Sequence, residues 1–219
     1  MALNRTNPGA QPHEPPALKP SNTQATVDFA HELGADQLNG VSYAVFGERS
    51  EPFSRERLAA SSEILGQVAE YARSAGIVMT FEVVNRYETA MLNTAEQAVA
   101  YVQQANSSNL KVHLDTYHMG IEEADMGKAI RDTVTWLGYL ELGQSGRGSL
   151  LTGAVDVRDA LQAAKDAGYA GRIGLEAFTR QFLDAPVANG LAIWRQTYTD
   201  PHQVAAEAIA LVRSVFETN

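Results

Sequence analysis

The sequence predicts an α/β protein, a parallel barrel of the TIM (β/α)8 type. Short apolar runs alternate with amphipathic helical segments, and this alternation implies a parallel sheet. The spacing of these runs is about 30 residues, the length of one βαβ unit. Several runs end in an acidic residue, as at the rim of a barrel where the carboxyl ends of the strands carry functional side chains. The 219 residues accommodate about six strands, so we expect a barrel that lacks the first two βα units.

The N-terminal segment differs in composition from the rest of the chain. Residues 1–22 contain five prolines and no periodic apolar pattern, so we predict an irregular tail. The regular alternation begins at Thr23. We therefore predict a tail over residues 1–22 and a partial barrel domain over residues 23–219.

Helix ends in the first half of the domain are marked by glycine and by a capping pattern. Predicted helices at Ala25–Leu33 and Ser54–Ser74 are each followed shortly by a glycine, the residue most favoured just after a helix. Thr94-Ala-Glu-Gln97 has the form of a capping box and predicts a helix to about Gln104. The apolar runs between these helices are the predicted strands Gln37–Val41 and Ile77–Val83.

The second half repeats the pattern. Asp156 is the expected N-cap of a helix at Val157–Ala167, and Asp200-Pro201 has the N-cap and N1 signature of a last helix ending near Phe216. A further helix is expected near Ala124–Thr133. The remaining apolar runs predict the strands Leu110–Asp115, Leu137–Leu142, Arg172–Glu176 and a sixth at Leu191–Trp194.

Four acids lie at or near the ends of successive predicted strands, one in each repeat: Glu82, Asp115, Glu141 and Glu176. A buried carboxylate is costly unless it is paired or binds a metal. Because parallel strand ends face the same rim, four such oxygen donors indicate a site for Mn²⁺ or Mg²⁺. The alternative for each single acid is a solvated loop residue, but four coincidences favour a site.

Composition excludes several classes of function. The formal charge is −9, from 17 basic and 26 acidic residues, which argues against a nucleic-acid partner. The chain has no cysteine, so it forms neither disulfides nor thiolate metal sites. We see no apolar run long enough to span a membrane and no secretory signal. We therefore expect a cytoplasmic protein without a membrane partner.

Two motifs, EVVNRYE from Glu82 and HLDTYHM from His113, together resemble the ketose 3-epimerases that act on D-tagatose and D-psicose. These enzymes belong to the sugar phosphate isomerase/epimerase superfamily of xylose-isomerase-like TIM barrels. The segments SGRGSLLTGAVDV, GYAGRIGLEAF and LAIWRQTYTDPHQVAAEA extend the resemblance to about residues 25–217.

The resemblance implies a metal-dependent sugar isomerase or epimerase that works through a cis-enediolate. Glu82 and Glu176 match the acid/base pair, and with Asp115 they match metal ligands. The metal implied is Mn²⁺, with Mg²⁺ and Co²⁺ as alternatives. Glu88, His118 and Arg147 match the residues that bind the oxygens of a small-molecule ketose. The resemblance also implies a homodimer or homotetramer.

The chain departs from the family pattern after the strand at Leu137. Glu141 stands where the family has its metal-binding histidine, and Gln144 replaces a glutamate. We include Glu141 in the predicted metal site, and we interpret His113 as structural. The two βα units with which family members begin are expected to be missing here, where the proline-rich tail stands.

Three alternatives stay open. The same metal and glutamate pair serves hydroxypyruvate isomerase and other aldose–ketose isomerases. The changes at Glu141 and Gln144 suit a truncated, catalytically inert barrel. A DNA-cleaving branch of the superfamily is disfavoured by the acidic charge.

Overall fold

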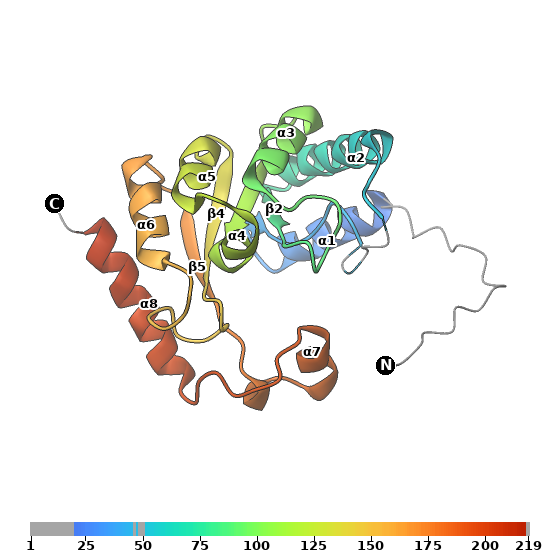
Figure 1. The fold of residues 1–219 in the computed structure, drawn as a ribbon. Helices are drawn as coiled ribbons and strands as arrows, with labels where there is room; N and C mark the ends of the chain where they lie inside the picture. The colour runs from blue at the N-terminus through green and yellow to red at the C-terminus, as the bar shows by residue number, and fades with distance from the viewer. Residues whose placement is uncertain (1–19, 46, 48–50, 218–219) are drawn as a thin grey trace.

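Five parallel strands form one curled sheet in the part of the chain that the computed structural model describes, residues 20–45, 47 and 51–217 (Figure 1). The strand order in space is the order in sequence, and each neighbouring pair is parallel. All five carboxyl ends therefore meet at one rim. The strands are β1 Gln37–Leu38, β2 Val78–Val83, β3 Leu110–Asp115, β4 Leu137–Gly143 and β5 Arg172–Glu176.

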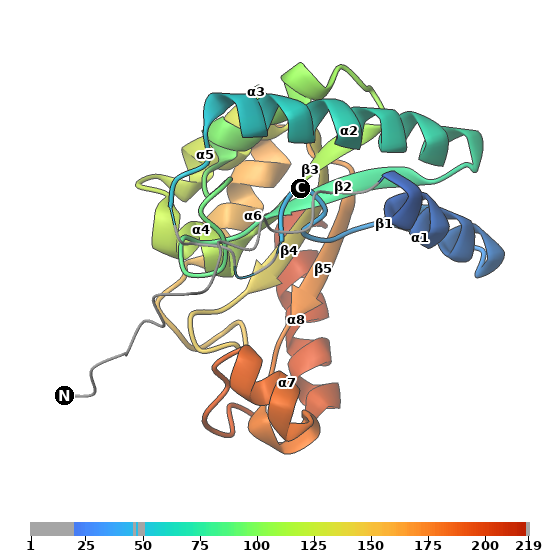
Figure 2. The ribbon, with the colours of Figure 1, turned by 90° about the vertical axis from the view of Figure 1, so that its right-hand side faces the viewer.

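Helices cover the outer side of this sheet. Figures 1 and 2 show α2, α3, α5, α6 and α8 arranged around it, with α1 beside β1 and α7 beyond the rim. The bounds are α1 Pro20–Glu32, α2 Arg55–Ser74, α3 Ala95–Ala105, α4 Thr116–Glu122, α5 Met126–Thr133, α6 Val157–Asp166, a 3₁₀ turn η1 Arg180–Phe182, α7 Ala185–Gly190 and α8 Pro201–Phe216.

The two faces of each strand carry different residues, because successive side chains point to opposite sides. On β3, Val112 and Leu114 are fully buried in the hydrophobic core, which joins the sheet to the helices. His113 and Asp115 alternate with them and therefore share the opposite, inner face. The inner face is polar at the rim, so the outer layer of helices supplies the apolar burial that stabilises the sheet.

Most predicted elements are found close to their predicted bounds. Strand β3 has the predicted bounds, and α3 opens with the predicted capping box, in which Thr94 accepts from the Gln97 backbone and Gln97 accepts in return. The Asp200 side chain accepts hydrogen bonds from two backbone N–H groups at the start of α8. These elements depend on local caps and apolar patterns, which are legible in sequence.

The predicted sixth strand at Leu191–Trp194 is wrong. Leu191 is the C-cap of α7, and Ala192 has the left-handed φ of 55°. The Ile193 N–H then donates to the Ala188 carbonyl at 2.8 Å. This run is thus the C-terminal turn of a helix, in which Ile193 is buried and Trp194 is exposed.

The start of the chain and three short helical segments also differ from expectation. Pro20, Ser21 and Asn22, assigned to the tail, form the first turn of α1, while the rest of the predicted tail, residues 1–19, lies outside the described residues. The segments α4, η1 and α7 were not predicted, because their seven, three and six residues are too few for a clear apolar period. Among the described residues no helix combines the length and apolarity needed to cross a membrane.

Candidate active site at the strand ends

Asp115 is the central acid of the rim. It ends β3 and is the N-cap of α4, where its side chain accepts from the Tyr117 N–H at 2.9 Å. It is fully buried. Gly143 on the adjacent strand leaves it room, since a β-carbon there would lie 2.6 Å from the Asp115 Oδ1 atom. The position of this carboxylate is therefore fixed by a helix cap and by the absence of a neighbouring side chain.

Arg147 connects two of the four acids. Its Nη1 atom lies 2.9 Å from Asp115 Oδ2 and 2.6 Å from Glu176 Oε2. The guanidinium also stacks on Tyr117, with Cζ 3.6 Å from the ring centroid. Arg147 has the left-handed φ of 54°, which costs about 1–2 kcal/mol for a residue with a side chain. Strain of this kind is typical of functional sites.

His118 on α4 faces three acids. Its Nε2 atom lies 3.4 Å from Glu82, 3.6 Å from Asp115 and 4.0 Å from Glu88. Its Nδ1 atom receives the backbone N–H of Asn85 at 3.1 Å and lies 2.8 Å from the Asn85 amide nitrogen. With donors at Nδ1, the ring proton resides on Nε2 and points toward the carboxylates.

Glu141 lies beside His113, with Oε2 3.2 Å from the Nε2 atom of the imidazole. The register pairs Glu82 with His113 and Asp115 with Glu141. These residues from three adjacent strands therefore stand side by side on the inner face. Three groups of side chains could hold a metal ion, each with its donor atoms within 4.8 Å of one another: Glu82, His113 and Glu141; Glu82, Asp115 and His118; Asp115, Glu141 and Glu176.

The two outer glutamates have different electrostatic surroundings. Burial raises the pKa of Glu176 to about 7, against the charge of Arg147, and nearby Asp115, Glu141 and Glu82 raise it further. Burial also acts to raise the pKa of Glu82, but the hydrogen bond from His118 and the proximity of His113, His118 and Arg147 lower it on balance. Two carboxyl groups whose pKa values are pushed apart can act as an acid and a base.

All seven residues predicted for the site lie at this rim. The quartet of acids is divided between overlapping groups, since Glu82 and Glu176 fall in different ones. Glu88, His118 and Arg147 adjoin the acids, and Arg147 Nη2 lies 3.4 Å from His118 Nε2. Their roles as ligands, acid/base groups and substrate contacts stay predictions.

Two residues at the rim were missed. Asn85 orients His118 and donates to Glu88 at 3.3 Å. His113 was interpreted as structural, yet it faces Glu82 and Glu141. The i, i+2 spacing of His113 and Asp115 within one strand is the signal that places both on one face.

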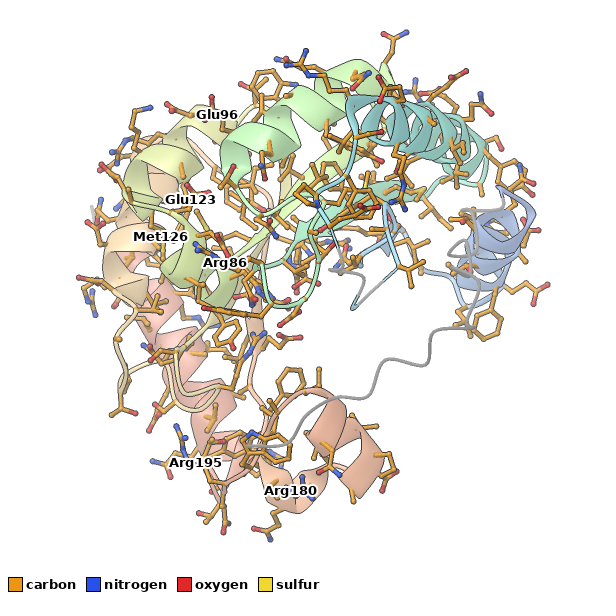
Figure 3. The ribbon with its side chains drawn as sticks, turned by 45° about the vertical axis from the view of Figure 1, so that its right-hand side comes forward. Arg86, Glu96, Glu123, Met126, Arg180 and Arg195 are labelled. Carbon is orange, nitrogen blue, oxygen red and sulfur yellow. The ribbon has the colours of Figure 1, made fainter. Side chains whose placement is uncertain are left out.

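The rim loops are fastened to α4 by acids at its end. Arg86, labelled over α4 in Figure 3, forms an ion pair with Glu122 at 2.8 Å. Glu123 accepts from the Ala95 N–H at the start of α3, at 2.7 Å. Glu122 and Glu123 are the last residue and the C-cap of α4, and they hold the loop that carries Asn85 and Glu88.

Comparison with known proteins gives consistent results. The profile of the family described as "Xylose isomerase-like TIM barrel" matches residues 8–215. The ketose 3-epimerase of Arthrobacter globiformis is 42% identical over 85% of this chain and 65% of its own length. The L-ribulose 3-epimerase of Mesorhizobium japonicum is 37% identical over 88% of this chain and 65% of its own length.

A solved structure gives the same result in three dimensions. The D-allulose 3-epimerase of Methylomonas sp., in complex with D-allulose, superposes with a TM-score of 0.85 and 36% identity over 90% of this chain and 68% of that one. This chain spans 65% of the length of the two curated relatives. The strand order, the polar rim and these matches lead to one conclusion: the chain belongs to the xylose isomerase-like TIM barrel family.

Proposed function

We propose that this chain carries the active site of a metal-dependent sugar epimerase, a ketose 3-epimerase acting on a small-molecule ketose. The observation that carries the proposal is the position of Glu82 and Glu176. They come from the second and fifth strands of the sheet, and Asp115, His118 and Arg147 lie between them. A sugar over Asp115 would have one carboxyl group on each side.

This arrangement suits inversion of one carbon next to a carbonyl. One glutamate removes the proton from C3 to give a cis-enediolate, and the other returns a proton to the opposite face. The Nε2–H of His118 and the guanidinium of Arg147 donate toward the oxygens that become negative. Glu88, 4.0 Å from His118, accepts from a sugar hydroxyl group.

The donor set fits a divalent cation. Glu82, Asp115, Glu141 and Glu176 supply the carboxylate oxygens that Mn²⁺, Mg²⁺ or Co²⁺ accept, and we propose Mn²⁺ as the physiological ion. When bound, the cation acts as a Lewis acid that stabilises negative charge on the substrate's oxygens. The proposal is supported by the groups of donor atoms within 4.8 Å of one another.

The names of the relatives support a ketose as the substrate. Hydroxypyruvate and aldose–ketose isomerases would use the same two glutamates, so these reactions stay the alternative within the same chemistry. The alternative without this chemistry is a barrel that has no catalytic activity. We also propose that the chain assembles as a homodimer or homotetramer, as the resemblance implies.

Turnover of candidate sugars tests the function. Purified chain with Mn²⁺ is incubated with D-fructose, D-psicose and D-tagatose, and with hydroxypyruvate for the alternative. We expect 3-epimerisation by the wild type and a loss of at least about 100-fold in Glu82→Gln and Glu176→Gln, because each removes one proton-transfer group. Glu96→Gln on the exposed face of α3 (Figure 3) is the control and should keep full activity.

The outcomes separate the alternatives. Conversion of hydroxypyruvate without epimerisation of any ketose would replace the proposed reaction with an isomerase. Equal background from the wild type and both glutamine variants would leave the inert barrel as the remaining account.

A further inference from the structure

His113 is a buried side chain whose ring nitrogens are without hydrogen-bond partners. It is 2% exposed, and neither Nδ1 nor Nε2 makes a hydrogen bond among the described residues. Leaving a buried polar group unsatisfied costs about 1–3 kcal/mol. Nε2 is 3.2 Å from Glu141 Oε2, but the approach lacks hydrogen-bond geometry. A buried imidazole in this state has a ring nitrogen that is available to bind another partner.

The surroundings of His113 present that donor atom to two carboxylates. Donor atoms of Glu82, His113 and Glu141 lie within 4.8 Å of one another. Glu82 is in register with His113 on the neighbouring strand. The Tyr139 ring packs edge-on against the imidazole, with centroids 4.7 Å apart, and restricts its orientation. Three adjacent strands thus hold one nitrogen and two oxygen donors in place.

Arg147 divides the acids at the rim. It pairs with Asp115 and Glu176, at 2.9 and 2.6 Å. Glu82 and Glu141, the two acids that adjoin His113, form no ion pair with an arginine among the described residues, so their oxygen atoms are available to a cation.

We propose that His113 is a metal ligand, which with Glu82 and Glu141 forms a mixed nitrogen–oxygen site for a divalent transition-metal cation. This inference rests on the proposed function and specifies how its cation is bound. Imidazole nitrogen suits transition metals such as Co²⁺ or Zn²⁺, and carboxylate oxygen suits Mn²⁺, whereas Mg²⁺ and Ca²⁺ prefer a shell of oxygen alone. Three protein donors leave coordination positions open to water or to sugar oxygens, as catalytic metal sites require.

Pulsed electron paramagnetic resonance of the Mn²⁺-loaded chain tests the nitrogen ligand directly. We expect nitrogen hyperfine coupling to Mn²⁺ in the wild type. The coupling pattern should change when histidine is labelled with ¹⁵N, and the coupling should be lost in His113→Gln. The matched control is His118→Gln, which removes the other imidazole of the rim and should keep the coupling. Titration of the metal-free proteins should show at least about tenfold weaker Mn²⁺ and Co²⁺ binding by His113→Gln, since even outer-shell partners of metal ligands are worth 10- to 100-fold.

Each failure has its own meaning. Tight Mn²⁺ binding without nitrogen coupling overturns the role of His113 and leaves an oxygen-only site, with the proposed function intact. Coupling that disappears in His118→Gln also overturns it, and this holds even if His113→Gln does not fold. An absence of Mn²⁺ binding by the wild type overturns this inference and the metal dependence of the proposed function together.

Discussion

At the scale of single residues, Arg147 determines how the acidic rim is stabilised without a ligand. It is buried, and its guanidinium forms ion pairs with both Asp115 and Glu176. Charged hydrogen bonds in such a site are stronger than neutral ones. Removing the guanidinium of Arg147 would leave two carboxylates that repel each other at a poorly solvated site.

We therefore predict that Arg147→Met destabilises the metal-free protein by about 3–5 kcal/mol, the usual cost of removing one partner of a buried pair. Urea unfolding in the presence of a chelator measures this loss in the free energy of unfolding. Arg73→Met is the control, because Arg73 and its partner Glu70 are both exposed and the loss of this pair should cost far less. Equal stability of the wild type and Arg147→Met would show that the guanidinium does not stabilise the rim.

The site residues could be predicted to very different degrees. Glu82, Asp115, Glu141 and Glu176 were accessible from sequence, because each lies at or near the carboxyl end of a strand and parallel ends converge. The pairing of Arg147 with only two of these acids could not be predicted from sequence. Arg147 comes from a loop whose path depends on tertiary contacts such as the stacking on Tyr117. Asn85 was missed for a similar reason: its partner His118 lies on another element.

At the scale of elements, the loop between β4 and α6 is organised by Gln144. The side chain is fully buried, and its Nε2 donates to the carbonyl groups of Leu150 and Val155 at 3.3 and 3.0 Å. Its Oε1 accepts from the N–H groups of Ser145 and Val155 at 2.7 and 2.9 Å. This amide thus satisfies backbone groups at both ends of the loop.

We predict that Gln144→Glu destabilises the protein by at least about 2 kcal/mol. The carboxylate would lose both donors and face two carbonyl oxygens, and unsatisfied buried groups cost about 1–3 kcal/mol, more when charged. Thermal melts compare it with Gln67→Glu on the exposed face of α2, which makes the same change in solvent. A Gln144→Glu protein as stable as Gln67→Glu would contradict this role for the amide.

Elements were predictable where the determinant was local. The capping box of α3 and the Asp200 cap of α8 needed only neighbouring residues. The run Leu191–Trp194 was misassigned because an apolar run of four residues fits a strand or a helix end equally well. Only the left-handed Ala192 decides between them, and sequence does not specify an alanine in that conformation.

At the scale of the whole molecule, the sheet curls until its two edge strands approach at the end opposite the rim. Arg172 at the start of β5 binds Asp36, just before β1, through both guanidinium nitrogens at 2.8 and 2.5 Å. The pair is exposed, so it contributes little free energy. It does mark how strongly the five parallel strands curve, as twisted sheets of this kind do, and this curvature gathers the strand-end acids.

The assembly expected from the resemblance stays a prediction at this scale. Edge strands present unpaired N–H and C=O groups that proteins usually cover, and β1 and β5 are the edges of the described sheet. Light scattering of the purified chain gives its mass directly and distinguishes a monomer from a dimer or tetramer.

The central claim is that the folded rim, with Glu82 as a ligand, binds a divalent cation, and calorimetric melting of the metal-free protein with added Mn²⁺ tests it most directly. Binding to the folded state alone stabilises by about 2.7 kcal/mol at one hundred times the Kd, or roughly 5–10 °C in Tm for a protein of this size. We predict a Tm that rises with Mn²⁺ concentration in the wild type and much less in Glu82→Gln. A wild-type Tm that is unchanged by millimolar Mn²⁺, or an equal rise in Glu82→Gln, would contradict the account.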